Sequence, residues 1–410
     1  MSEWNQGLLR DIATIIMGQS PKKEEVNSHG IGLPLLNGPT EFGPNYPTPV
    51  QFSDNCRKVA PQNSLLFCVR GSTTGRMNWA DQKYGIGRGL ASIVHKSGNA
   101  YNSFLKGVVD KSLSSLLASA TGSTFPNVSR DQLNDLKISI PPLPEQKAIA
   151  HILGKLDDKI ELNRQINQTL EAMAQALFKS WFVDFDPVLD NTLEAGSEIP
   201  DSLQAMAEKR QLVPNSKKLL HTNPALAAQF PSAFVFNEVL DKWVPEGWSD
   251  TIFGDEYNIT MGQSPPGSSY NEEGTGKPFS QGKTDFGFRF PSNRIYCTDP
   301  KREANKNDTL ISVRAPVGNA NLASSDCIIG RGLSAVRHLS GSISFTYYSV
   351  LQLREIFDVF EGEGTVFGSI NQTSLKGIRL VNPSNDLING FDSLASSLDK
   401  KIGSTTNLME

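Results

Sequence analysis

The sequence predicts an α+β protein built from two copies of one unit, in which each unit is a globular domain followed by a helix. The five residues MGQSP occupy positions 17–21 and return at 261–265. Later blocks follow in the same order in both halves, at offsets that drift only from 244 to 242. Within each copy, short runs rich in β-branched and aromatic residues alternate with Gly, Pro and Asn turns, which is typical of short strands. Such an ordered internal repeat indicates a duplicated domain.

The first copy is predicted to span 1–141 and the second 244–386. SLLFCVRGSTTGRMN at 64–78 corresponds to TLISVRAPVGNAN at 309–321. YGIGRGLASIV at 84–94 corresponds to CIIGRGLSAVR at 327–337, so that Arg88 stands opposite Arg331. In this scheme MGQSP closes the first β element of each domain, with Gly18 and Gly262 permitting the turn. Because the motif is identical in both copies, we expect it to have the same role in each domain rather than to distinguish one domain from the other.

A long helix is predicted over 142–185, after the prolines of PPLPEQ. Positions stepping by four and three from residue 149 form a predicted coiled-coil seam: Ile149, Leu153, Leu156, Ile160, Asn163, Asn167, Leu170, Ala174, Leu177 and Trp181. Two asparagines in the seam are expected to fix the register with a partner helix. A helix of this length is expected to extend beyond one domain rather than pack only on its own.

The partner is predicted in the same chain, at the end of the second copy. A shorter helix is expected over 387–410, with a matching seam of Phe391, Leu394, Leu398 and Ile402. The two helices would pack antiparallel about a pseudo-two-fold axis, and this second helix can cover only part of the first. Residues 186–243, rich in proline and acidic groups, are predicted to be a linker. Trp243 and Trp248 are expected to anchor the entry into the second copy.

Composition excludes several classes of protein. No apolar run approaches the length of a membrane span, and Cys56, Cys68, Cys297 and Cys327 form no C-x-x-C pair. The scattered cysteines fit a reducing compartment, so a cytoplasmic location is expected. The five histidines show no zinc-binding spacing, so no metal is expected. The net charge of −4 is uneven, because residues 1–140 carry +4. In the second copy a local basic cluster is therefore needed to hold a phosphate backbone: the candidates are Lys277, Lys283, Arg289, Arg294, Lys301 and Arg302, each of which is at least as well explained as solvated surface charge.

Catalytic motifs are absent. NEEGTGKP at 271–278 lacks the first glycine and the final hydroxyl residue of a phosphate-binding P-loop, and VNPSN at 381–385 is not the Asn/Asp-Pro-Pro-aromatic motif of an amino-methyltransferase. GIGRG at 85–89 opens no convincing βαβ unit, so a turn is expected there rather than a dinucleotide site. We therefore expect no catalysis by this chain alone.

The segment PPLPEQKAIAHILGKLDDKIELN, with ALFKSWFVDFDPV after it, resembles the central conserved region of the specificity subunits of Type I restriction–modification systems. FPSAFVFNEVLDKWVPEGW at 230–248 resembles that family's lead-in to the second half. The resemblance covers essentially the whole chain. It implies two target-recognition domains, each reading one half of a bipartite, asymmetric DNA site, with the helices setting the spacer between the half-sites. This chain departs from the family's pattern in its short C-terminal helix. The resemblance therefore does not establish the second of the two surfaces on which the family docks its methylation subunits.

The same resemblance implies the partners and cofactors. The helices would dock two methylation subunits, which carry S-adenosylmethionine, while separate restriction subunits hydrolyse ATP with Mg²⁺ and cut double-stranded DNA. No cofactor is expected in this chain itself. The ruler role implies that shortening the first helix by a heptad would shorten the spacer.

Residues that touch DNA are predicted among polar loop positions, because Arg and Lys pair with guanine, Asn and Gln with adenine, and Ser and Thr adapt to either. In the first copy they are Gln19, Ser20, Lys22, Lys23, Arg70, Ser72, Thr73, Thr74, Arg76, Asn78 and Arg88. In the second copy they are Gln263, Ser264, Ser268, Tyr270, Lys283, Arg289, Arg314, Asn319, Asn321 and Arg331. Arg88 and Arg331, in a shared turn, favour phosphate contact over base readout. Arg70 and Arg314, at matching strand ends, are equally well explained as structural salt bridges.

Two other functions remain open at the level of sequence. One is a pseudo-dimeric coiled-coil scaffold that binds proteins rather than DNA. The other, less favoured, is a standalone DNA-modifying enzyme. Salt-dependent DNA binding and a methylated bipartite motif distinguish the specificity role from the scaffold.

Overall fold

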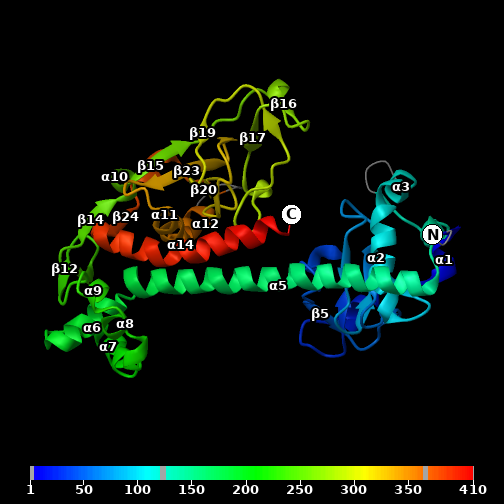
Figure 1. The fold of residues 1–410 in the computed structure, drawn as a ribbon, viewed down its shortest axis with the longest axis horizontal. Helices are drawn as coiled ribbons and strands as arrows, with labels where there is room; N and C mark the ends of the chain where they lie inside the picture. Colours follow the sequence, from blue (N-terminus) through cyan, green and yellow to red (C-terminus); the bar gives the residue numbers. More distant parts are fainter. Residues whose placement is uncertain (1–3, 121–125, 363–367, 410) are drawn as a thin grey trace. The chain divides into compact units, whose positions relative to one another are not determined.

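The computed structural model describes residues 4–120, 126–362 and 368–409 of the chain. The chain divides into two compact units, Met1–Leu162 and Asn163–Glu410 (Figure 1). Among the described residues, no helix is both long and apolar enough to span a bilayer.

The first unit is a mixed α+β domain. Its elements before the long helix are β1 (Asn5–Leu8), α1 (Leu9–Ile12), β2 (Ala13–Met17), β3 (Val26–Asn27), β4 (Leu33–Leu36), β5 (Gln51–Ser53), β6 (Val59–Ala60), β7 (Leu65–Cys68), β8 (Met77–Trp79), β9 (Tyr84–Ile86), β10 (Leu90–His95), α2 (Asn102–Lys111), α3 (Leu113–Ala118), α4 (Arg130–Asn134) and β11 (Lys137–Ile140). An antiparallel sheet has the order β2-β10-β7-β8, and a second sheet the order β3-β5-β4-β9-β6, in which β4 and β9 run parallel. β1 pairs with β11, which ties the two ends of the domain together.

Two apolar clusters hold the first unit together. One face of the four-stranded sheet contributes Leu65, Phe67 and Ile93 to a cluster that includes Phe104 and Leu105 of α2. The alternate residues Leu66, Cys68 and Leu90 join Tyr84 and Ile86 of the second sheet. Because successive side chains of a strand point to opposite faces, β7 is buried on both sides, which explains its unbroken apolar run LLFC.

The second unit repeats this topology. The elements of its repeated domain are β14 (Ser249–Ile252), α10 (Phe253–Glu256), β15 (Tyr257–Met261), β16 (Tyr270–Asn271), β17 (Lys277–Ser280), β18 (Tyr296–Cys297), β19 (Glu303–Ala304), β20 (Thr309–Ser312), β21 (Ala320–Leu322), β22 (Cys327–Ile329), β23 (Leu333–His338), α11 (Ile343–Gln352), α12 (Arg354–Gly362), α13 (Gln372–Lys376) and β24 (Arg379–Asn382). The sheet orders are β15-β23-β20-β21 and β16-β18-β17-β22-β19, again with one parallel pair, β17 and β22. The duplication inferred from MGQSP is therefore a duplication of fold.

The long helix α5 (Leu143–Phe182) has 40 residues and passes from the first unit into the second. It contains no proline after Pro144 to interrupt it. Its N-terminal part packs on the first unit, where Ile149 and Ala150 join the apolar cluster. Asp157 also forms an ion pair with Lys106 of α2 at 3.0 Å. Leu156, predicted to lie in the seam, is 57% exposed. The seam is thus not a continuous coiled coil with one partner.

The C-terminal part of α5 pairs with α14 (Asn385–Asn407) in the second unit (Figure 1). Phe178 meets Phe391 at 5.4 Å between ring centroids, and Asn167 donates to the Thr406 hydroxyl at 3.1 Å. The partner numbers fall as the α5 numbers rise, so the two helices run antiparallel, as predicted. Ala174, Phe178 and Trp181 of α5 are almost completely buried in the apolar cluster that α5 shares with α14.

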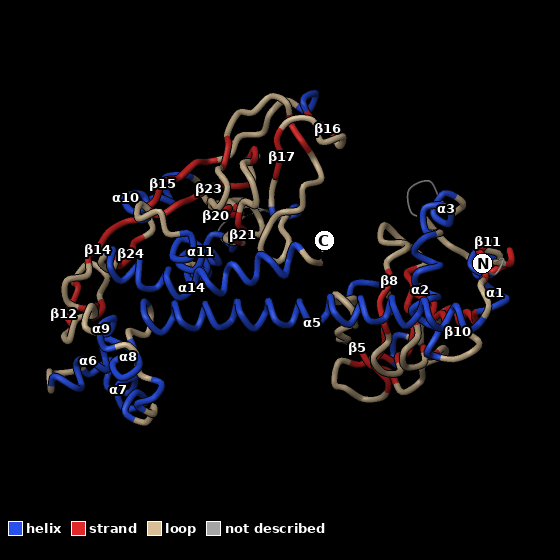
Figure 2. Tube along the Cα trace, viewed as in Figure 1, coloured by secondary structure: helices blue, strands red, loops and turns tan. Residues whose placement is uncertain are grey.

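Residues 186–243, predicted to be a linker, are folded and belong to the second unit. They form α6 (Asp186–Ala195), α7 (Gln204–Gln211), α8 (Leu219–Thr222), α9 (Pro224–Ala227) and the hairpin β12 (Phe234–Asn237) and β13 (Lys242–Pro245), which are visible in Figure 2. Phe230 packs edge-on against Trp181 at 5.1 Å. Trp248 is buried in the same cluster and Trp243 packs against it, which confirms the predicted anchoring.

Candidate nucleic-acid interface

The glycine of MGQSP is required by a close approach of backbone to backbone. A Cβ atom on Gly18 would lie 2.1 Å from the Gly87 carbonyl oxygen, and one on Gly262 would lie 2.2 Å from that of Gly330. The amide of Gly18 donates to Leu90 O, and that of Gly262 to Leu333 O. In both units the motif therefore packs the end of an edge strand of the four-stranded sheet, β2 or β15, directly against the shared turn GRG. A positive φ angle is not the reason for either glycine.

The serine of MGQSP orients the arginine of that turn. Ser20 Oγ accepts from the backbone amide of Arg88 at 3.2 Å, and Ser264 Oγ accepts from that of Arg331 at 3.2 Å. The preceding glutamines donate through their backbone amides, Gln19 to Ile86 O and Gln263 to Ile329 O. The identical motif thus fixes the same turn in each unit and leaves both arginine side chains exposed.

A second exposed arginine adjoins the turn in each unit. Arg70 directly follows Val69, whose amide donates to Gly89 O at 2.9 Å; Arg314 follows Val313, whose amide donates to Gly332 O at 2.9 Å. Arg70 donates from Nε to Asn127 Oδ1 at 3.1 Å, so its guanidinium group is partly engaged. No salt bridge to Arg70 or Arg314 is formed within the described parts of the chain. The arginine pairs 70/88 and 314/331 are therefore brought together by the fold.

In the second unit this edge encloses a cavity of about 460 Å³. Among the residues that the structure describes, the lining contains three cationic side chains and no carboxylate: Ser264, Gln281, Gly282, Lys283, Thr284, Arg314, Ala315, Pro316, Arg331 and Gly332. Unpaired like charges around one cavity repel each other and favour a bound anion. Four of the sequence-predicted residues, namely Ser264, Lys283, Arg314 and Arg331, meet here.

Sequence reasoning missed Gln281, which lines the same cavity. It follows β17 directly, where that strand runs parallel to β22, and its backbone amide donates to Asp285 Oδ2 at 2.9 Å. The signal that points to it is its place after a buried strand, at the edge where the GRG turn also lies. A pattern search for basic and repeated residues does not detect such a position.

Three predicted contact residues are buried, which removes them from the candidate set. Asn78 is 4% exposed and donates to Gly43 O at 2.8 Å, and Asn321 is 1% exposed and donates to Gly287 O at 3.1 Å. Each asparagine anchors the same loop in its unit. Arg289 is 1% exposed and points into the helix pair rather than to solvent.

The other candidates fall into two groups. Those exposed to solvent are Gln19, Lys22, Lys23, Ser72, Arg76, Gln263 and Ser268. Those half-buried with a hydrogen bond or contact inside their own unit are Thr73, Thr74, Tyr270 and Asn319. Tyr270 also stacks on Phe279. Of the basic cluster proposed for the second copy, Lys277 pairs with Glu303, Arg294 with Asp285 and Lys301 with Asp299.

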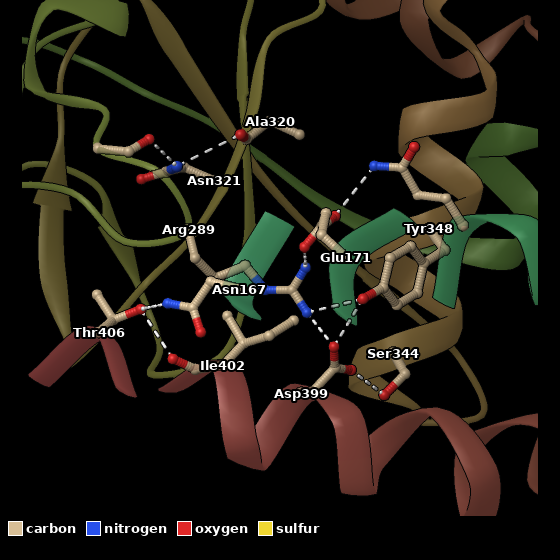
Figure 3. Close-up of polar contacts among 12 residues, drawn as sticks. Asn167, Glu171, Arg289, Ala320, Asn321, Ser344, Tyr348, Asp399, Ile402 and Thr406 are labelled. Carbon is tan, nitrogen blue, oxygen red and sulfur yellow. Dashed lines mark hydrogen bonds and ion pairs between the residues drawn. The ribbon is translucent and has the colours of Figure 1, made fainter. Parts of the chain in front are cut away.

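Arg289 joins three elements of the second unit (Figure 3). Its guanidinium group donates to Glu171 of α5 at 2.6 Å and to Asp399 of α14, and it lies 4.1 Å from the ring centroid of Tyr347. Burial alone would lower the pKa of Arg289, but the surrounding Tyr347 and Asp399 raise it. Burial raises the pKa of Glu171 and raises that of Tyr347 to about 12.

The helix pair also carries exposed apolar side chains. On α14, Ile402 is buried and Leu398 packs on the aromatic cluster, whereas Leu394 is 41% exposed. On α5, Leu170 and Leu177 are half-buried, as are Leu153 and Ile160, and Asn163 and Asn167 are buried. The side chains of Ile152, Leu162 and Met173 are exposed.

Comparison with known proteins decides the family. The model of the Type I restriction modification DNA specificity domain matches residues 1–172. The Type I restriction enzyme HindI specificity subunit of Haemophilus influenzae is 30% identical over 319 residues, which cover 70% of this chain and 68% of that protein. The chain belongs to the Type I restriction enzyme specificity subunits.

Two further similarities agree with this family. The putative type I restriction enzyme MjaX specificity subunit of Methanocaldococcus jannaschii is 32% identical over 262 residues; the match covers 63% of this chain and about half, 51%, of that relative. The crystal structure of a Type I restriction–modification S subunit from M. genitalium has the same fold, with a TM-score of 0.53 at 16% identity, and the match covers 99% of this chain and 92% of the other. The α+β fold with two similar domains and long helices is therefore that of a specificity subunit.

Proposed function

We propose that this chain is the DNA sequence-recognition subunit of a Type I restriction–modification complex. Each recognition domain reads one half of a bipartite, asymmetric site in double-stranded DNA. The observation that carries the proposal is the duplicated serine-held arginine turn, which presents the same cationic edge in both units next to loops that differ. A shared scaffold with diverged loops is what two unlike half-sites require.

The helices provide the remaining functions. Because α5 passes from one unit into the other, it sets the spacer between the half-sites. The exposed apolar residues of α5 and α14 dock methylation subunits, two for each specificity subunit, and restriction subunits join that complex. S-adenosylmethionine, ATP and Mg²⁺ are bound by those partners in the cytoplasm. This chain itself catalyses no reaction and binds no cofactor.

The test is to co-express the chain with the methylation subunits encoded beside it and to map methylated bases in the host genome. A bipartite methylated motif that disappears without this chain supports the proposal. Absence of any motif, together with the absence of salt-dependent DNA binding by the assembled complex, favours a protein-binding scaffold instead.

A further inference from the structure

The two units share some groups at the cationic edge and differ in others. The shared groups are the serine of MGQSP and two arginines, which occupy equivalent places with the same backbone hydrogen bonds, 3.2 Å in each copy for serine to arginine. Groups common to both domains cannot tell two unlike half-sites apart. They suit the part of DNA that is the same everywhere, which is the phosphate backbone.

The differing groups lie next to them. β4 and β17 correspond at an offset of 244, which places Asn37 opposite Gln281 and Pro39 opposite Lys283. Asn37 is engaged inside its own unit, because its amide donates to Gln51 Oε1 at 2.8 Å and its Oδ1 faces Ser20 Oγ at 3.4 Å. Pro39 offers no polar side chain. The first unit therefore presents no free polar side chain at these two places.

In the second unit both positions are available. Gln281 and Lys283 are exposed and line the 460 Å³ cavity together with Arg314 and Arg331. Among the residues that the structure describes, none forms a hydrogen bond or ion pair with the side chains of Gln281 or Lys283. Glutamine matches the N6/N7 edge of adenine, and lysine matches O6/N7 of guanine.

We propose a division of labour at this edge, which rests on the function proposed above. Arg331 and Arg314 hold a DNA phosphate, as Arg88 and Arg70 do in the first unit, whereas Gln281 and Lys283 read base edges of the second half-site alone. Ser20 and Ser264 are positioning residues, because they act through the backbone of Arg88 and Arg331.

The experiment uses the assembled complex of this chain with its methylation subunits. Its affinity is measured at several salt concentrations for a duplex that carries the motif mapped for the wild type and for a scrambled duplex of the same length. For R331A we expect affinity for both duplexes to fall by the same factor, the slope of log K against log salt to shrink by about 1, and the methylated motif to stay unchanged. R331K should restore the slope, because a phosphate accepts a point charge whereas a bidentate guanine contact does not.

For Q281A and K283A we expect the opposite result. Discrimination at one base pair of the second half-site should fall by roughly 5- to 150-fold, with the first half-site read as before. R379A is the matched control, since Arg379 is an exposed arginine of the same domain that lines a different cavity and pairs with Asp250. It should leave both the slope and the motif unchanged.

The outcomes separate the two proposals. If the wild-type complex methylates no bipartite motif, the proposed function fails, and this inference fails with it. If the wild type gives a motif but R331A alters it, or R331A leaves the salt slope unchanged, the phosphate assignment is overturned. If Q281A and K283A both preserve discrimination in the second half-site, the base-reading assignment is overturned while the function stands.

Discussion

Arg289 forms a buried ion pair with Asp399, and through it a recognition-domain loop is joined to the helix α14 (Figure 3). The same guanidinium group binds Glu171 of α5, so that one side chain contacts both helices of the pair. A buried charge with two acidic partners is costly to leave incomplete, because each remaining charge is then unpaired in a poorly solvated place.

Replacing Arg289 by methionine should therefore lower the free energy of unfolding of the second unit by about 3 to 5 kcal/mol. Urea denaturation followed by tryptophan fluorescence measures the change. The control is K277A, which breaks the half-exposed pair with Glu303 at 2.7 Å and should leave the urea midpoint close to that of the wild type, because exposed ion pairs contribute little to stability. Equal effects of the two variants would contradict a structural role for Arg289.

Replacing Gly262 by alanine should destabilise the second unit by roughly 1 to 3 kcal/mol, because the new Cβ would overlap backbone atoms that cannot move aside easily. Gly267, five residues further on, has open space around its Cβ position and no positive φ. G267A should therefore melt with the wild type in a thermal scan, while G262A melts earlier. If the two variants melt together, the close approach at Gly262 does not constrain the residue type.

Inserting one heptad into α5 after Leu162, where the first unit ends, should lengthen the spacer of the recognised motif. Seven residues add about 10 Å of helix, or about 3 base pairs. Methylation mapping should find both half-sites unchanged and only the gap enlarged. An unchanged spacer in a folded, active complex would contradict the proposal that α5 sets the distance between the half-sites. An insertion of equal length in the exposed β12–β13 turn is the control.

His95 makes the first unit sensitive to mild acid. Burial lowers its pKa from the ordinary 6.5, and its Nδ1 accepts from the Ser97 amide at 3.0 Å, which a protonated ring cannot do. Because the folded-state pKa lies below that of the unfolded chain, the stabilisation is complete above the unfolded pKa and is lost as the pH falls through the folded one.

The Tm of the wild type should accordingly fall more steeply below about pH 6.5 than that of H95Q, which carries no titrating group at this place. His221 is exposed, so H221Q should follow the wild-type profile throughout. Parallel pH profiles for H95Q and the wild type would show that the protonation of His95 does not contribute.

The repeat predicted the architecture well, because duplication leaves paired sequence signals even where the loops have diverged. The antiparallel helix pair was predicted for a similar reason: Phe391, Leu398 and Ile402 lie at helical spacing and are buried or packed as expected. The contact residues were harder to predict. Asn78, Asn321 and Arg289 have the chemistry of base readers, and only burial shows that they serve their own loops and helices.

Two further differences have physical causes. Leu156 fits the heptad pattern but is exposed, because the N-terminal part of α5 is held on its own domain by neighbouring positions such as Ile149 and Asp157. Residues 186–243 were predicted to be a linker because they are rich in proline. Their apolar side chains nevertheless pack on the aromatic cluster around Trp181. A sequence pattern indicates which secondary structure a segment prefers, but it does not reveal which surface of the protein that segment covers.

The packing of α5 against α14 also sets an order of events during synthesis. The first unit is contiguous in sequence and ends at Leu162, so it can fold while the ribosome is still making the rest. Trp181 and Phe182, in contrast, pack on Phe391, which emerges more than two hundred residues later. Until then the newly made end of α5 keeps its aromatic face without this partner, which makes the nascent second half the stage at which a chaperone is most needed.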